Sequence, residues 1–464
     1  MALLWAGSAI RGPLPSPPGH SAPPHPSNSC VSSPKSKINR NLSLYERKIT
    51  LEREASLGSL EAAIQRMAGK PHLMRLYALI TRPRLARGHV ELRMRRAWTL
   101  LGVYLQMGRW SRARALEKRL LGDEALRDLY RFRIGDFRPS GLAIGNDWFR
   151  VLADERVEEL AAYLLEGTGE LTDWLAGNLG ESPGRITFFM YPGVGPSPFN
   201  ASLRHVYLMA GHYRAREHDR TVVRGALAHE IAHIHLRRVL GFSFSKEDYG
   251  RAKLFDEGWA QMCGWRAARA WPEKLAEAHA LSREAIAVCP GLLQSSLDAW
   301  SETLFERPWV PLYPMAMSFT AWVGDRSGEE ALREVFAAPV REGMDHRVRD
   351  CLGEGLADLL EGWRSWLSQW SGFTGDGFIR FGGPRPAGEG SFRVVYDSRY
   401  PIRPEGNLLA AQGERLLEIE SEAPDPRFSR RGAFTVRGVG EGPMEITAAF
   451  GARLQKVRLE DGSL

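Results

Sequence analysis

The spacing of apolar residues divides the chain into regions of different secondary structure. From Leu51 to about Gly135, apolar residues recur every three or four positions, which predicts several short helices. From residue 146 the pattern changes and predicts one long helix at 155–179 and three strands, at 147–154, 186–192 and 205–211. A small sheet is therefore expected after a helical domain.

A run of helices and then a group of short strands complete the pattern. Helical spacing is found at 221–240, 255–270, most of 271–305, 313–323, 329–336 and 345–370. A Gly/Pro-rich linker at 371–390 ends the helical region. Beyond it, turn residues separate five strand candidates, at 392–396, 415–420, 433–437, 444–450 and 454–459. This spacing is typical of a small β-sandwich.

These patterns predict an α+β fold in five parts. They are a disordered Pro/Ser-rich lead-in at 1–40, a helical domain at 41–140, a central domain at 146–370 with a small sheet and a helical half, the linker at 371–390, and a small all-β domain at 391–464. Within the helical domain, 97–122 resembles a tetratricopeptide hairpin, but no second copy follows at the repeat period. An irregular helical domain is the simpler interpretation.

The positive charge of the chain is concentrated in the helical domain. The segment from Arg75 to Arg119 holds twelve basic and two acidic residues, a net charge of +10, while the whole chain carries +7. One interpretation is contact with an anionic partner, either nucleic acid or a membrane surface. The other is a solvated arginine face of a helical hairpin.

Composition sets limits on the compartment. No apolar run reaches the roughly 18 residues needed to span a bilayer, so no transmembrane segment is predicted. The first twenty residues lack the basic start and small-residue cleavage site of a secretory leader. The four cysteines form no C-x-x-C pair, which favours reduced thiols. The cytoplasm is the default compartment, with export left open.

The segment ALAHEIAHIHLRRVLG carries the strongest chemical signal. It places His229, Glu230 and His233 inside an apolar helix, where unpartnered polar groups cost free energy. Residues four apart share a helix face, so the two imidazoles can bind one metal ion, and Glu230 beside them can take a proton from a metal-bound water. Two hydrogen-bonded core histidines are the alternative.

A catalytic zinc needs a third protein ligand and an open position. The metzincin spacing is excluded, because Leu236 and Val239 stand where that motif requires glycine and histidine. The better candidate is Glu257 in KLFDEGWAQM, at the expected start of a new helix. His235 is expected to point away from the metal, at the surface or behind a ligand.

HEIAH followed by FDEGWA resembles the gluzincin metallopeptidases, in particular the peptidase MA-like family, over about residues 146–340. The resemblance implies a thermolysin/gluzincin-like catalytic domain in which His229, His233 and Glu257 hold one Zn²⁺ and Glu230 is the general base. It also implies that the strand at 205–211 pairs with an extended peptide substrate.

Three further expectations follow from the resemblance. A downstream tyrosine that donates to the oxyanion would be Tyr313, for which a buried structural role is the alternative. The position that holds a histidine-orienting aspartate in the thermolysin branch is Gln261 here, and Asp256 is the other candidate for that contact. The G-x-M-E-N signature of the aminopeptidase branch is absent around HVYLMAGHY, so aminopeptidase activity is not implied.

The sequence thus predicts a zinc-dependent peptidase with peptide or protein substrates. Two alternatives remain open. One is a scaffold or binding protein with an idle or structural zinc site that acts through its basic helical and β domains. The other is a non-peptide hydrolase, since the same groups would serve any polarised carbonyl.

Overall fold

The computed structural model describes residues 137–459, with short gaps, and scattered residues between 78 and 122. The gaps are at 193–198, 201–204, 246, 299, 301–302, 304–306, 308–309, 339–342, 373–374, 376 and 423–428. The chain forms two compact units, which meet in sequence between Phe137 and Arg138. The lead-in at 1–40 lies outside the described residues, as do residues 98, 99, 102, 105 and 106 of the expected tetratricopeptide-like hairpin at 97–122.

In the unit before Arg138, the helix with described bounds is α4, Trp110–Leu121. It is amphipathic, with Ala113, Leu116 and Leu120 buried. Arg112, Arg114 and Arg119 lie on its exposed side. In the described part of the basic segment, these arginines therefore form a solvated face.

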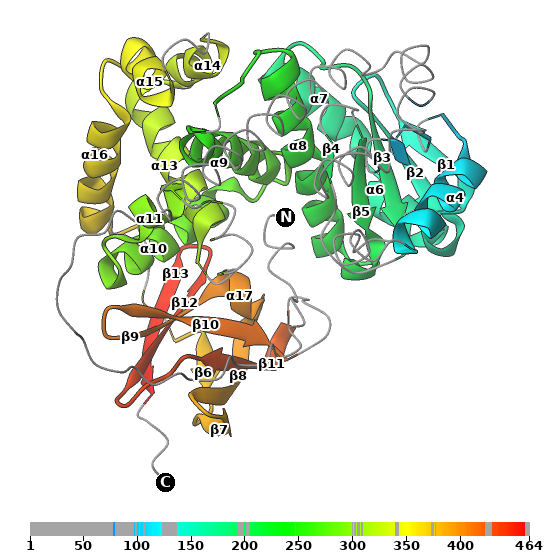
Figure 1. Cartoon of the computed structure of the whole chain (residues 1–464). Helices are drawn as coiled ribbons and strands as arrows, with labels where there is room; N and C mark the ends of the chain where they lie inside the picture. The colour runs from blue at the N-terminus through cyan, green and yellow to red at the C-terminus, as the bar shows by residue number, and fades with distance from the viewer. Residues whose placement is uncertain are drawn as a thin grey trace, which may run out of the picture. The chain divides into compact units, whose positions relative to one another are not determined.

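The unit that begins at Arg138 opens with a five-stranded sheet in the order β1-β2-β3-β5-β4 (Figure 1). Its strands are β1 Pro139–Gly145, β2 Phe149–Asp154, β3 Ile186–Tyr191, β4 Phe199–Asn200 and β5 His205–Met209. The three central strands are parallel, whereas β1 and β4 run antiparallel at the edges. The apolar run of β3 is almost wholly buried, as expected for a central strand. Strand β1 was not predicted.

The long helix expected at 155–179 is broken. A 3₁₀ turn, η3 Glu155–Val157, leads into α6 Glu158–Leu165, and α7 Thr168–Leu179 follows. Gly167 between the two helices has φ of 77°, a backbone conformation that glycine adopts without the steric cost of a side chain. Apolar spacing continues across this glycine, which is why the pattern predicted one helix.

Two long helices follow the sheet in the chain and cross each other. They are α8, Glu217–Arg238, and α9, Tyr249–Ala267. Where they cross, a Cβ on Gly225 or on Gly264 would lie 2.9 Å from the other glycine's carbonyl oxygen. These two glycines therefore let the helix backbones approach closely, which brings the faces that carry the histidines and Glu257 together.

A third helix, α13 Leu312–Ser327, packs against α9 in the same way. A Cβ on Gly258 would overlap Thr320 Oγ1 and the carbonyl oxygen of Ala316. The glycine that follows Glu257 is thus required by the close approach of α13.

The remaining helices complete the helical half (Figure 1). They are α10 Trp271–Val288, α11 Leu292–Asp298, α14 Glu329–Ala337, α15 Met344–Leu352 and α16 Leu356–Gln369. The single helix expected at 345–370 is two helices, because Gly353 has φ of 78° and Gly355 follows it. Within the described residues, no helix is both long enough and apolar enough to cross a membrane.

The C-terminal part is an all-antiparallel sheet with strands ordered β13-β12-β9-β10-β11-β8-β6, and β7 pairs with β8. They are β6 Ile379–Phe381, β7 Arg385–Gly388, β8 Ser391–Ile402, β9 Leu408–Gln412, β10 Arg415–Ser421, β11 Ser429–Arg437, β12 Met444–Phe450 and β13 Arg453–Leu459. A short helix, α17 Pro404–Asn407, interrupts them.

Two expectations about this part were wrong. One hydrogen-bonded path of strands surrounds a core that includes Ile419, Phe434 and Ile446, in place of the two separate sheets of a sandwich. The expected linker at 371–390 contributes β6 and β7 to the sheet. Both strands are short, and Gly and Pro surround them, so the sequence pattern resembled a linker.

Candidate metal centre

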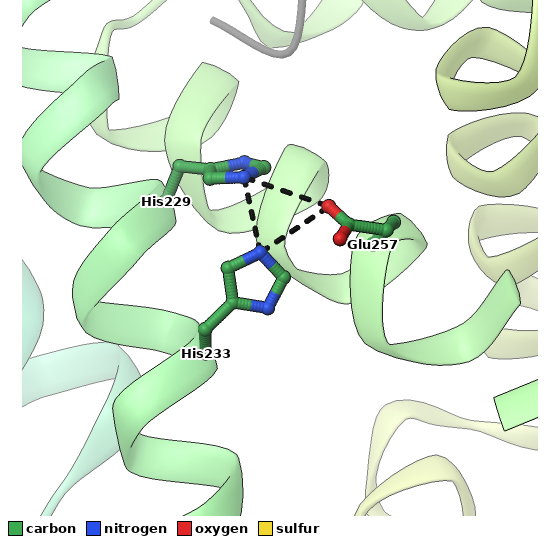
Figure 2. A group of neighbouring side chains, drawn as sticks. All are labelled: His229, His233 and Glu257. Atoms are coloured by element: carbon green, nitrogen blue, oxygen red, sulfur yellow. Dashed lines mark hydrogen bonds and ion pairs between the residues drawn. The ribbon is translucent and has the colours of Figure 1, made fainter. Parts of the chain in front are cut away.

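Three buried side chains bring their ligand atoms together where α8 and α9 cross (Figure 2). Nε2 of His229 and Nε2 of His233 are 3.1 Å apart. Oε2 of Glu257 lies 3.2 Å from Nε2 of His233 and 3.7 Å from Nε2 of His229. The sequence placed these three residues in one site, and the structure brings them together.

The spacing and chemistry of these donors fit a zinc ion. Ligands at about 2.0–2.1 Å from a tetrahedral zinc lie roughly 3.3 Å from one another, close to the three distances here. Imidazole nitrogen and carboxylate oxygen are both zinc ligands. Among the described residues, this group has three members and no fourth. Three is the number of protein ligands that catalytic zinc sites use.

Helix geometry presents the ligands from two elements. His229 and His233 stand one turn apart on α8, which is buried on nearly all sides. Glu257 does not begin a helix as expected, because α9 starts eight residues earlier at Tyr249. Glu257 therefore projects from a continuous helix whose position α8 and α13 fix on two sides.

Asp256 orients His233 from behind. Its Oδ1 lies 2.6 Å from Nδ1 of His233. A carboxylate at this distance accepts the Nδ1 proton, so Nε2 is the nitrogen that faces the cluster and can bind a metal once it is deprotonated. The side chain in contact with the imidazole is thus Asp256, while Gln261 bonds elsewhere.

Two cations that the sequence analysis overlooked hold the carboxylates. Nζ of Lys253 lies 2.9 Å from Oδ2 of Asp256 and 2.8 Å from Oε1 of Glu257. A nitrogen of the Arg237 guanidinium lies 3.2 Å from the same Asp256 oxygen. The i, i+3 and i, i+4 spacing of Lys253 to Asp256 and Glu257 on one helix was the signal that could have revealed this contact.

The electrostatics of the metal-free cluster favour a cation among the three ligands. Burial lowers the pKa of His233, but the carboxylates of Asp256 and Glu257 outweigh it and raise that pKa to about 9. Burial alone would raise the pKa of Glu257, yet Lys253 and His233 hold it far below its usual value. Burial keeps the pKa of His229 well below its ordinary value. A proton therefore occupies His233 where a metal would otherwise bind.

Glu230 lies beside the cluster and is 7% exposed. Burial raises its pKa to about 7, although His233 opposes the shift. The charge of Glu230 acts on the nearby hydroxyl of Tyr213. Burial, with the charges of Asp219 and Glu230, raises the pKa of that hydroxyl. A carboxylate with a pKa near neutrality can both accept and return a proton.

Tyr313, in the first turn of α13, is the other predicted residue near the cluster. Burial, with the nearby carboxylates of Glu257 and Glu230, raises the pKa of its hydroxyl well above the usual value, so it is a hydrogen-bond donor at neutral pH. Cys263 is a buried free thiol of the core. His235 lies outside the ligand group and is buried, not at the surface, and burial lowers its pKa to about 4.

No protein-family model matches the chain, and a search of curated proteins finds no match.

Proposed function

We propose that this chain is a zinc-dependent peptidase of the gluzincin type. The observation that carries the proposal is the convergence of Nε2 of His229, Nε2 of His233 and Oε2 of Glu257, which lie 3.1–3.7 Å from one another in a buried group without a fourth described ligand. The resemblance of HEIAH and FDEGWA to the peptidase MA-like family supports the same reading.

Each residue has a separate role in this proposal. His229, His233 and Glu257 hold Zn²⁺, which when bound makes a carbonyl more electrophilic and lowers the pKa of a water. The Glu230 carboxylate takes the proton of the attacking water and returns it to the leaving amine. The Tyr313 hydroxyl donates a hydrogen bond to the carbonyl oxygen as negative charge develops on it.

The arrangement favours a catalytic site over a structural one. A structural zinc is enclosed by four protein ligands, whereas the described group offers three. A structural site also has no use for a buried carboxylate such as Glu230 next to the ligands. A scaffold with an idle zinc site would need neither the three-ligand group nor the carboxylate of Glu230.

The test is cleavage of a mixed peptide library by the zinc-loaded full-length protein, read by mass spectrometry. Glu230→Gln should retain zinc and lose activity by at least a hundredfold, because the amide cannot accept the proton. Glu217→Gln, a change to an exposed carboxylate on the same helix, is the matched control and should cleave like the wild type. Zinc binding without cleavage of any peptide would favour the scaffold or a non-peptide hydrolase.

A further inference from the structure

The two oxygens of the Glu257 carboxylate have different surroundings. Oε2 lies 3.2 Å from Nε2 of His233 and 3.7 Å from Nε2 of His229. Oε1 lies 2.8 Å from Nζ of Lys253, which stands one turn earlier on α9. A carboxylate can bind a metal ion through one oxygen or through both. The surroundings of Oε1 therefore bear on how Glu257 binds the metal.

The ammonium group of Lys253 is held at this position by a second carboxylate. Its Nζ lies 2.9 Å from Oδ2 of Asp256, and the side chain is 14% exposed. Asp256 is itself fixed, because Oδ1 lies 2.6 Å from Nδ1 of His233 and Oδ2 lies 3.2 Å from the Arg237 guanidinium. The i, i+3 and i, i+4 spacing lets one ammonium reach both carboxylates of α9. Lys253 therefore has little freedom to leave Oε1.

An ammonium group at Oε1 competes with a metal ion for that oxygen. The hydrogen bond from Nζ is charge-assisted, so Oε1 has less electron density to offer a second cation. If Oε1 also bound the metal, the metal ion would lie closer to the ammonium, and the repulsion between the two positive charges would grow. Both effects favour binding through Oε2, the oxygen that already faces the imidazoles.

Loss of the ammonium would remove both effects. Within the described residues, the donor that Oε1 contacts is Lys253. The side chain of Glu257 is 9% exposed, so water has little access to replace that contact. A bound metal ion would then be the nearest positive charge for both oxygens, and the carboxylate would turn toward it.

We propose that Lys253 is a positioning residue that holds Oε1 of Glu257 off the metal, so that this glutamate contributes one ligand atom in place of two. The proposal rests on the proposed function, because that function requires a metal ion at this site. It assigns Lys253 a role in the reaction, since a second oxygen on the metal would compete with water and with the substrate carbonyl.

The experiment loads the full-length protein with Co²⁺ in place of zinc and measures its visible absorption. Cobalt accepts the same ligands, and its visible bands weaken as the coordination number rises from about four to about five. The wild type should show the strong bands of a four-coordinate ion. In Lys253→Met, Oε1 should join the metal, and the bands should weaken by roughly a factor of two.

Two further variants separate this role from a merely structural one. Lys253→Arg keeps a cation and its donors beside Oε1, so it should restore the wild-type spectrum. Lys274→Met is the matched control on α10, where Lys274 contacts Glu277 at 2.9 Å in a similarly buried i, i+3 pair. It should leave the cobalt spectrum unchanged.

A crystal structure of the zinc-loaded wild type tests the same point, even if Lys253→Met fails to fold. Oε2 should lie about 2.0–2.2 Å from zinc, while Oε1 still contacts Nζ of Lys253. Two oxygens of Glu257 at bonding distance from zinc, or an unchanged cobalt spectrum in folded Lys253→Met, would overturn the proposal.

The outcomes also distinguish this role from the peptidase function. Failure of the wild type to bind either metal would contradict the metal centre and the role of Lys253 with it. A cobalt spectrum that depends on Lys253, without cleavage of any peptide, would support the role of Lys253 and contradict the peptidase proposal alone.

Discussion

Nζ of Lys253 lies 2.8 Å from Oε1 of Glu257, so that Oε2 is the oxygen of this carboxylate that faces the two imidazoles. The ammonium group also contacts Asp256 at 2.9 Å. One largely buried cation therefore contacts both carboxylates, with Arg237 and protonated His233 supplying further positive charge, and it fixes which oxygen of Glu257 is available as a ligand. The metal-free site depends on this cation for its charge balance.

Replacing the cation should destabilise the metal-free protein more than the zinc-loaded protein. Lys253→Met leaves two buried carboxylates with less compensation, and loss of one partner of a buried pair costs about 3–5 kcal/mol. Zinc supplies positive charge at the same place, so part of this loss should disappear when zinc is bound. Urea unfolding with chelator and with zinc measures the difference. Lys253→Arg keeps the charge and should lose less stability than Lys253→Met. Equal losses of stability for Lys253→Met in the metal-free and zinc-loaded states would contradict the interpretation.

Removing the charge of Asp256 should weaken zinc binding. In Asp256→Asn the 2.6 Å contact to Nδ1 of His233 loses its ionic character, and changes of this kind typically lower metal affinity about 10–100-fold. Competition with a chromophoric chelator measures the affinity. Asp350→Asn changes a similar aspartate–histidine pair on the surface, where Asp350 contacts His346 at 3.2 Å, and should leave the affinity unchanged. A similar loss in both variants would argue against an orienting role for Asp256.

Zinc binding should release a proton and strengthen with pH. His233 has a pKa of about 9 in the metal-free protein, so near pH 7.5 it is protonated, and it must lose that proton to become a ligand. The apparent affinity should therefore rise up to about tenfold per pH unit and level off above pH 9. Calorimetry in buffers of different ionisation enthalpy gives the number of protons released.

The raised pKa of His233 should make the metal-free protein less stable as the pH rises, whereas zinc affinity rises with pH. Because the pKa of His233 is raised from 6.5 in the unfolded chain to about 9, its stabilising contribution is complete below pH 6.5 and is lost as the pH rises through 9. The free energy of unfolding, measured with chelator present at pH 6, 8 and 10, tests this prediction. An affinity for zinc that does not change with pH would contradict the proton assignment.

A methyl group at Gly258 should separate α9 from α13. In Gly258→Ala the added Cβ would overlap Thr320 Oγ1 and the Ala316 carbonyl oxygen, and overpacking of this kind costs about 1–3 kcal/mol or more. Since α13 carries Tyr313, activity should fall as well. Gly177→Ala, inside α7 with open space around it, is the matched control and should be neutral or slightly stabilising. The measurement is the free energy of unfolding in urea.

Local spacing was sufficient to predict much of the site. His229 and His233 are four residues apart on one helix, so a single periodic segment brings their imidazoles together. The position of Glu257 depended on the resemblance of FDEGWA to a known motif, because a contact between two helices leaves no period in the sequence. Strands such as β3 were predicted because their apolar runs are long and continuous.

Glycines within apolar segments and contacts between elements account for the features that the sequence did not predict. Gly167 and Gly353 each break a helix whose apolar spacing continues across the break. Gln261 occupies the position expected to orient a histidine, yet Trp265 takes its oxygen and Asp256 takes the imidazole. Strands β6 and β7 pair with β8, which follows them directly in the chain, but each is only three or four residues long and lies among Gly and Pro, so the local pattern resembled a linker.

The most direct test of the central claim is the zinc content of the full-length protein, measured by plasma mass spectrometry after dialysis against micromolar zinc and then against buffer. We predict about one zinc per chain in the wild type and in Glu217→Gln, and loss of zinc in His233→Ala and Glu257→Ala. Absence of zinc from the wild type, or full retention in Glu257→Ala, would contradict a site formed by His229, His233 and Glu257.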